Sequence, residues 1–99
     1  MRVLTSILKE SLSYYQRFER TLQRRLARLP KGSVKRRRLK GRVYYYLQRR
    51  HGDKVIHTYL GRQKPVELLQ GIQERRRLKQ ELAKVRAALR LLPRRKLAA

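Results

Sequence analysis

The spacing of apolar residues predicts a long helix in the first third of the chain. Between residues 3 and 29, apolar side chains recur at steps of four and three, a heptad-like pattern typical of an amphipathic helix. The stripe contains Leu8, Leu12, Tyr15, Leu22, Leu26 and Leu29. Glu19 occupies the one missing position, with Phe18 beside it. Pro30 is expected to end the helix, because a proline disfavours helical backbone at the residue before it.

The same spacing predicts a second long helix over residues 65–92. Its stripe contains Leu78, Leu82, Val85, Leu89 and Leu92. Pro65 and Glu67 suit the first turn, where a missing N–H costs nothing and an acid meets the positive end of the helix dipole. Gly71 is a weak point that allows a kink or a break. Pro93 is expected to stop the helix.

The hydrophobic period changes to two in the middle segment, residues 33–61, which is typical of strands. Three strands are expected, at residues 34–40, 42–49 and 54–60. Lys40-Gly41 and His51-Gly52-Asp53 supply the turns between them, because glycine tolerates positive φ. This segment therefore predicts a three-stranded antiparallel β-meander.

Together these patterns predict a single α+β domain over residues 1–99, with residues 93–99 as a frayed tail. Two long antiparallel amphipathic helices, 3–29 and 65–92, would form a coiled-coil-like hairpin, and the β-meander between them would lie at one end of it. Neither helix can bury its stripe alone. Dimerisation through the same stripes is the alternative to pairing within one chain.

Alternation along the strands separates an apolar face from an aromatic one. With a short connection through His51-Gly52, the apolar face would contain Val43, Tyr45, Leu47, Ile56 and Leu60. The open face, beside arginines of the first strand, would contain Tyr44, Tyr46, His57 and Tyr59. A slip of one residue would instead place Tyr44 and Tyr46 beside the aliphatic residues of the third strand. We prefer the first register because it gathers the aliphatic side chains on one face.

The charge balance indicates a polyanionic partner. The 99 residues include 29 Lys and Arg against 6 acidic residues, a formal net charge of +23. The acids can neutralise only a small part of this charge, and such a chain repels itself. A nucleic-acid backbone would turn that cost into a gain through counterion release. An anionic membrane surface is a weaker candidate, because the apolar stripes match each other and contain no Trp. A highly solvated protein without a polyanionic partner is the remaining alternative.

Candidate contacts to nucleic acid come from all three segments. Aromatic rings interleaved with arginine are typical of surfaces on which bases stack. Those in the strand segment are Lys35, Arg36, Arg37, Arg38, Lys40, Arg42, Tyr44, Tyr46, Arg49, His57 and Tyr59. Those in the helices, for phosphate contacts, are Arg17, Arg24, Arg28, Arg75 and Lys79. With Arg20 between them, the arginines of the first helix recur at three- and four-residue steps and line one flank. Cross-strand aromatic pairing that only stabilises the sheet is the alternative role for the tyrosines.

Residues for catalysis or metal binding are scarce. The chain has no Cys, and Asp53, His51 and His57 are its only aspartate and histidines. No third histidine completes a metal-ligand set, and no nucleophile, base and orienting group can be assigned. We therefore expect a non-enzymatic protein without a cofactor or metal. Without a spanning apolar run or a secretory signal, the expected compartment is the cytoplasm.

The middle segment resembles a group of short uncharacterised prokaryotic proteins. The shared pattern is LPKGS, a basic run, KG, YYYLQ, a glycine turn, a lysine and YLG. In this chain it covers Leu29–Ser33, Lys40-Gly41, Tyr44–Gln48, Gly52, Lys54 and Tyr59–Gly61. A basic helix follows. The resemblance implies no particular activity.

More weakly, the strand segment is similar to the arm-type DNA-binding domains of tyrosine recombinases. That resemblance implies a basic three-stranded sheet with a tyrosine-rich middle strand, placed in the major groove of duplex DNA. The chain departs from the pattern in its long first helix and in having no catalytic recombinase domain.

The sequence thus predicts a nucleic-acid-binding protein, for RNA or DNA, that acts as an accessory subunit of a mobile-element, defence or ribonucleoprotein complex. Arg and Lys would contact phosphates, and Tyr44, Tyr46 and Tyr59 would contact bases or sugars. The alternative is a coiled-coil assembly or adaptor protein that forms a homodimer or binds a protein partner.

Overall fold

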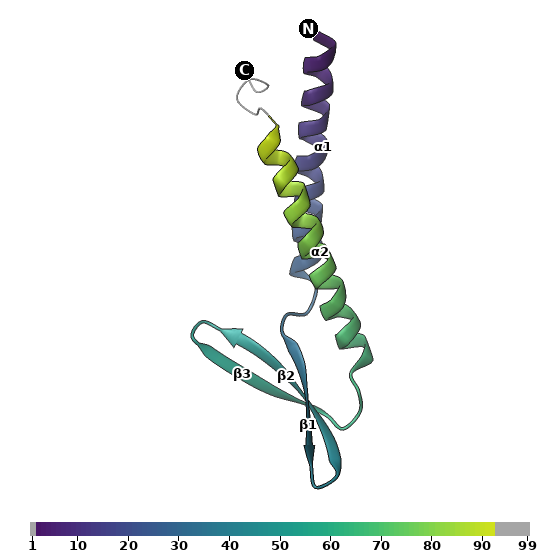
Figure 1. Ribbon diagram of the computed structural model, residues 1–99, viewed down its shortest axis with the longest axis vertical. Coiled ribbons are helices and arrows are strands. Elements are labelled where there is room, and N and C mark those ends of the chain that lie inside the picture. Colours follow the sequence, from purple (N-terminus) through teal and green to yellow (C-terminus); the bar gives the residue numbers. More distant parts are fainter. Residues whose placement is uncertain (1, 93–99) are drawn as a thin grey trace. The chain divides into compact units, whose positions relative to one another are not determined.

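The computed structural model describes residues 2–92 (Figure 1). Along the chain, one helix precedes three strands and a second helix follows them: α1 (Arg2–Ala27), β1 (Ser33–Leu39), β2 (Arg42–His51), β3 (Lys54–Gly61) and α2 (Val66–Leu91). This order confirms the predicted α+β class and the helix–sheet–helix arrangement. The expected stop at Pro93 and the tail 93–99 lie outside the described residues.

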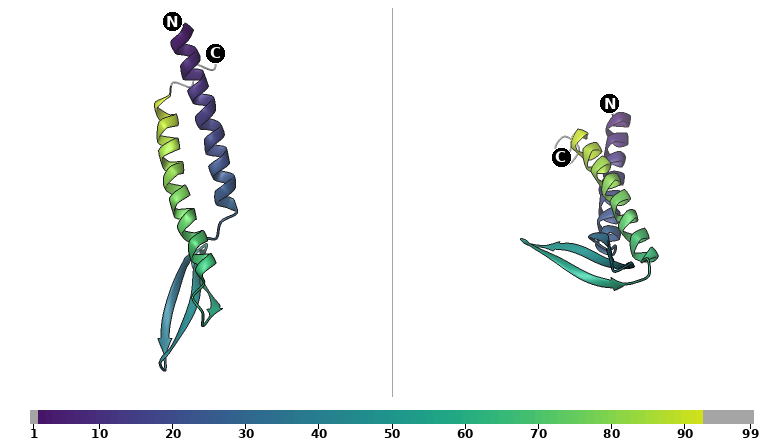
Figure 2. Two further views of the ribbon diagram at one scale, coloured as in Figure 1. Left: turned by 90° about the vertical axis from the view of Figure 1, so that its right-hand side faces the viewer. Right: turned by 60° about the horizontal axis from the view of Figure 1, so that its bottom comes forward.

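The chain divides into two compact units. The helical unit consists of the residues up to Arg28 together with those from Arg77 onward. The sheet unit is Leu29–Arg76, and it contains the three strands and the first part of α2. Within the helical unit, α1 and the later part of α2 run side by side in opposite directions (Figures 1 and 2).

Apolar burial in the helical unit follows the predicted spacing. Among its described residues, the buried side chains are Leu22, Leu26, Leu78, Leu82, Val85 and Leu89. Of these, Leu22, Leu78 and Leu89 are each 1% exposed. The remaining predicted stripe residues of α1, Leu8, Leu12 and Tyr15, are half-buried. Burial is therefore deepest in the half of α1 next to Pro30.

The interruption of the first stripe has a structural explanation. Glu19 accepts a hydrogen bond from Arg86, with 3.1 Å between Nε of Arg86 and Oε2 of Glu19. This ion pair joins α1 to α2 at the position where the apolar spacing fails. An acid is tolerated there because its carboxylate meets a cation on the opposing helix rather than an apolar side chain.

The helix ends follow from the two prolines. α1 ends at Ala27, two residues before the predicted end, because Leu29 precedes Pro30 and is disfavoured in helical backbone. At the start of α2, the Pro65 carbonyl accepts a hydrogen bond from the Leu69 N–H at 3.0 Å. Pro65 therefore stands at the helix start, where its missing N–H leaves no gap in the hydrogen-bond ladder.

Gly71 neither kinks nor breaks the second helix, contrary to one of our expectations. α2 runs without interruption from Val66 to Leu91. A Cβ at Gly71 would lie 2.8 Å from Cγ and 2.9 Å from Cδ of Pro30. The glycine makes room for the proline ring against α2, which accounts for its place inside a helix better than local weakness does.

The sheet has the order β1-β2-β3, with both neighbouring pairs antiparallel. Two-residue turns connect the strands. Lys40 and Gly41 both have positive φ, as in a type I′ turn, whereas only Gly52 does so in the Gly52-Asp53 turn, as in type II′. These short turns fix the register, which therefore pairs the strands as the preferred sequence interpretation required.

The apolar face of the sheet is less buried than we predicted. Val43, Tyr45 and Leu47 are half-buried, and Ile56 is 39% exposed. Leu60 has no direct partner, because Tyr46 pairs with Tyr59 and Tyr45 with Gly61, which leaves Leu60 in a β-bulge. A bulge bends its sheet, and the two hairpins of this sheet point in different directions (Figure 1).

Candidate nucleic-acid interface

Strand register gathers the three exposed-face tyrosines on one side of the sheet. Residues directly opposite each other in neighbouring strands share a face. Tyr44 lies opposite Arg37, and Tyr46 lies between Lys35 of β1 and Tyr59 of β3. We call this side the tyrosine face. Its candidate contact residues are Lys35, Arg37, Leu39, Arg42, Tyr44, Tyr46, His57 and Tyr59.

The tyrosine rings form one cluster. The ring of Tyr59 lies 5.4 Å from that of Tyr46 and 6.2 Å from that of Tyr44, between centroids, with tilts of 53° and 48°. The Arg37 guanidinium lies over the Tyr46 ring, 5.4 Å from its centroid. Such a cation–π contact holds a ring in place at little entropic cost. The cluster is therefore ordered by its own contacts while Tyr59 remains 54% exposed.

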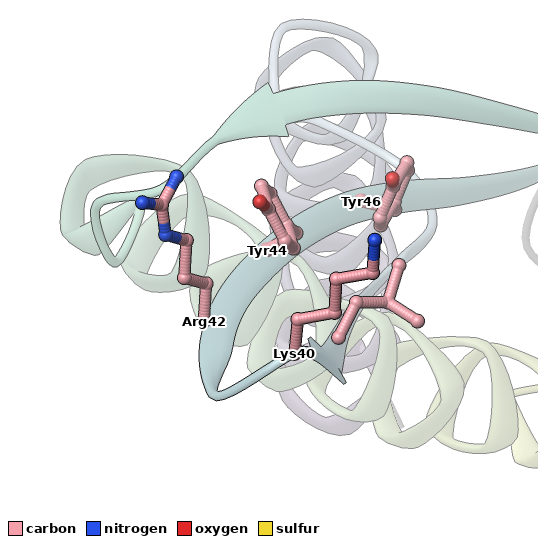
Figure 3. Close-up of a pocket in the computed structure, with 5 residues that line it drawn as sticks. Lys40, Arg42, Tyr44 and Tyr46 are labelled. Carbon is pink, nitrogen blue, oxygen red and sulfur yellow. The ribbon is translucent and has the colours of Figure 1, made fainter.

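A pocket opens beside this cluster, next to the turn between β1 and β2. It has a volume of about 590 Å³ and is lined by Leu39, Lys40, Arg42, Tyr44 and Tyr46. The rings of Tyr44 and Tyr46 rise from the same side of β2, and Arg42 stands next to Tyr44 (Figure 3). The walls thus combine flat aromatic surface with two cations, and no acidic residue lines them.

Lys40 reaches the pocket from a strained position. Its φ is 51°, and it is the only non-glycine residue with positive φ in the part of the chain that the structure describes. Left-handed backbone costs an L-residue about 1–2 kcal/mol, and Gly or Asn is favoured there. A lysine at this position gives up turn stability and places a cation beside the tyrosines.

The register also places the strand arginines, which the sequence analysis treated as one group of candidate contacts, on opposite faces of the sheet. Arg36 lies opposite Tyr45, and Arg38 lies opposite Val43, so both are on the other side of the sheet from the tyrosine face. Arg49, opposite Ile56, joins them there. Of the first-strand cations proposed to flank the tyrosines, only Lys35 and Arg37 do so. Alternation along β1 accounts for this split.

The helix candidates belong to both units. Arg17, Arg24, Arg28 and Lys79 are exposed in the helical unit. Nη2 of Arg24 donates to Thr21 Oγ1 at 3.4 Å. Arg75 belongs to the sheet unit, where it is half-buried and its Nε is buried without a hydrogen-bond partner among the described residues. Its Nε therefore cannot contact a phosphate without rearrangement.

Leu39 is the pocket residue that sequence reasoning missed. It is 58% exposed and lies directly opposite Arg42. Counting back from the Lys40-Gly41 turn would have placed it on the tyrosine face. An exposed leucine among arginines draws little attention in the sequence, because single apolar residues on a surface are common.

Residues 2–92 contain no group of three His, Asp or Glu side chains arranged to hold a metal ion. None of their helices is long and apolar enough to cross a membrane. None of the three strands contains an acidic residue.

Residues 12–71 match a family described as a domain of unknown function (DUF6788), and this match covers more than half of the chain. The chain belongs to the DUF6788 family. The DUF6788 segment contains the whole sheet and every residue of the tyrosine face, whereas Val3, Leu4 and Ile7 lie outside it. Comparison with curated proteins and with solved structures gave no match.

Proposed function

We propose that this DUF6788 protein is a non-enzymatic nucleic-acid-binding protein that binds with its tyrosine face. The observation that carries the proposal is the cluster of Tyr44, Tyr46 and Tyr59 on strands that contain basic residues and no acidic ones. Basic side chains supply sequence-independent affinity for phosphates. The rings supply stacking, which contributes about 1–3 kcal/mol per base.

The competing role for the cluster is to stabilise the sheet. Cross-strand aromatic pairs contribute about 0.2–1 kcal/mol, so Tyr59 is expected to have some such effect. However, Tyr59 is 54% exposed. A ring that only stabilised the sheet would contribute more if it were buried, because the hydrophobic contribution grows with the apolar area removed from water. Exposure next to Arg37 and Tyr46 favours a binding role.

The sharpest test compares two adjacent arginines. Arg37→Ala and Arg36→Ala each remove one positive charge from β1, but Arg37 lies on the tyrosine face and Arg36 on the opposite side. Fluorescence anisotropy with labelled RNA and DNA oligonucleotides at fixed salt should show a loss of affinity of about tenfold or more for Arg37→Ala, the size expected for a charge-assisted contact. Equal losses for the two variants would mean that only net charge matters, and would overturn the proposal.

A second matched pair tests the stacking contribution. Tyr59→Ala should weaken binding about tenfold, while Tyr14→Ala should leave affinity unchanged. Tyr14 has a similar exposure, 56% against 54%, but lies on α1. Circular dichroism on both variants checks that the fold persists. Unchanged affinity in a folded Tyr59→Ala variant would reduce the cluster to a structural role.

For the helical unit, we propose that the two helices pair as a coiled coil. The buried residues Leu78, Leu82, Val85 and Leu89 are spaced by four, three and four, and Leu22 and Leu26 on α1 by four, as a heptad seam requires. The Glu19–Arg86 ion pair resembles the flanking pairs that set helix orientation in such structures.

One observation favours a second function, assembly of two copies through α1. Val3, Leu4, Ile7 and Tyr14 are 76%, 53%, 52% and 56% exposed. Residues 3–16 contain one lysine and one glutamate as their only charged groups, so this segment is neutral in a chain of charge +23. Tyr14 stacks on Phe18 in a nearly parallel arrangement, with 6.1 Å between ring centroids.

The neutrality of this segment supports a second copy of the chain as the partner. Two such basic chains repel each other wherever their cationic surfaces meet. Antiparallel contact between two copies of residues 3–16 would bury the exposed apolar residues and direct the basic remainder of each chain away from the other. Such a contact is isologous, as in most homodimers.

Light scattering after size exclusion tests this second function. The double variant Leu4→Ser, Ile7→Ser should convert a dimer into a monomer, whereas Leu91→Ser should not, although Leu91 is 86% exposed. A monomeric unsubstituted protein at micromolar concentration would remove the second function. It would leave the nucleic-acid proposal in place.

A further inference from the structure

The pocket beside Tyr44 and Tyr46 contains the two chemical features of a nucleotide site. Leu39 and the two rings provide apolar and flat surface, and Lys40 and Arg42 provide positive charge. A ligand that satisfies both is a flat, largely apolar group attached to an anion. A free phosphate would leave Leu39 and the rings unused, and an apolar ligand would leave the cations without partners.

Within nucleic acids, these walls favour an unstacked base. Bases in a duplex are covered on both flat faces by their neighbours and expose only their edges, which proteins read with hydrogen-bonding groups. The pocket offers ring faces and a leucine instead. Proteins that bind single strands stack bases on aromatic side chains beside a positively charged groove.

The pocket is also ordered before any ligand arrives. Tyr46 is held between Arg37 on one side and Tyr59 on the other, each 5.4 Å from its ring centroid. Lys40 is the first residue of a two-residue turn and Arg42 follows that turn directly, which gives both little freedom of backbone movement. In Figure 3 the Lys40 side chain extends toward Tyr46. Ordered walls reduce the entropy that binding must overcome.

We propose that this pocket holds one unpaired base of single-stranded nucleic acid, with Lys40 and Arg42 on the adjoining phosphates. The proposal rests on the proposed function and names its ligand class. A single base in the pocket would contact few hydrogen-bonding groups, so the preference for single strands should exceed any preference among the four bases.

Three forms of one oligonucleotide test the proposal by fluorescence anisotropy at a single salt concentration. They are a 12-nucleotide single strand, the same strand with abasic sites, and the matching duplex. The intact strand should bind about tenfold or more tightly than the abasic strand, which keeps the phosphates and lacks the bases. It should also bind at least as tightly as the duplex, although the duplex has twice the charge.

Leu39→Ser provides a variant that tests the pocket without disturbing the core. Leu39 is 58% exposed, so the fold should persist, while the difference between intact and abasic strands should shrink severalfold. Ile56→Ser is the control, because Ile56 is an exposed strand residue on the other side of the sheet from the tyrosine face, and it should leave this difference unchanged.

The outcomes separate this inference from the proposed function. Equal binding of intact and abasic strands, or no effect of Leu39→Ser, would overturn the pocket. If the duplex were then still bound and Arg37→Ala weakened that binding more than Arg36→Ala, the proposed function would stand. Absence of binding to all three forms would remove both.

Discussion

The two units of this protein are stabilised in different ways. In the described part of the helical unit, six apolar side chains are buried, whereas the sheet unit buries Ile72 of α2 and no strand residue. The sheet is instead held by its hydrogen-bond ladders, two short turns and contacts between neighbouring side chains. The helical unit is therefore stabilised mainly by the burial of apolar side chains, whereas the strands of the sheet leave their side chains accessible to solvent.

This difference determines which side chains are accessible to a partner. Side chains that stabilise by burial cannot also contact a partner, so the buried stripe residues of the helices, such as Leu22 and Leu78, are unavailable for binding. The sheet has no such constraint, and its aromatic and basic groups remain accessible on the tyrosine face.

The largest expected effect comes from breaking the core of the helical unit. Leu78 is 1% exposed, and Leu78→Ala should lower the free energy of unfolding by about 2–5 kcal/mol, through lost burial and the cavity left behind. Leu39→Ala, at a leucine of 58% exposure, should cost less than about 0.5 kcal/mol. Urea denaturation followed by circular dichroism measures both. Similar losses for the two variants would contradict the contrast between the units.

The next effect concerns the sheet unit, where close backbone approach replaces burial. Gly32 has a φ of 112°, and a Cβ there would lie 2.6 Å from the carbonyl oxygen of Gln48. Gly32→Ala should therefore destabilise the protein by about 2 kcal/mol or more. Gly52→Ala, at a φ of 62° with no atom within 4 Å, should cost only the backbone strain of about 1 kcal/mol. If the two variants unfold at the same urea concentration, contact at Gly32 is not the cause.

Sequence alone predicted the elements well, because the spacing of apolar residues differs between the helical and the strand segments and prolines and glycines mark the boundaries. The change of period from about 3.6 to 2 located the strands, and the glycine turns located the hairpins. The face that contains Tyr44, Tyr46, His57 and Tyr59 also followed, since a two-residue turn leaves one register. Strands, turns and register depend on residues that are close in the sequence, and the spacing of residues along the chain therefore predicts them.

The remaining features depend on contacts between distant residues. Nothing in the sequence marks the bulge at Leu60, because one extra residue leaves no periodic signal. From the sequence, Gly71 predicts a weak point in the helix, whereas the structure shows that it leaves space for the ring of Pro30. The pocket was missed since its exposed leucine contributes nothing to either period. Local patterns identified the tyrosine face, and the same alternation along β1 separates Lys35 and Arg37 from Arg36 and Arg38.

A smaller effect would sharpen the contrast between stability and binding within the sheet. Lys40→Asn should stabilise the protein by about 0.5–1 kcal/mol, because Asn-Gly fits a type I′ turn better than Lys-Gly. The same variant should weaken binding of a single strand, because the pocket loses one cation. Thermal unfolding and anisotropy on one preparation measure both quantities. A variant that gained stability and kept full affinity would assign Lys40 no role in the pocket.

The smallest effect concerns the Glu19–Arg86 ion pair between the helices of the helical unit. Glu19→Gln should cost about 0.3–0.5 kcal/mol, since the Arg86 side chain is 47% exposed and solvent weakens the pair. The loss should vanish in 1 M salt, where charges are screened over about 3 Å. Glu10→Gln is the control: it removes an exposed acid from the same helix and changes net charge equally. If both variants lose the same stability at low salt, the cost reflects the repulsion of a chain of charge +23, and the pair itself contributes nothing. If only Glu19→Gln responds, the missing position of the first stripe is a specific electrostatic contact, which orients two helices that are otherwise held together by leucines.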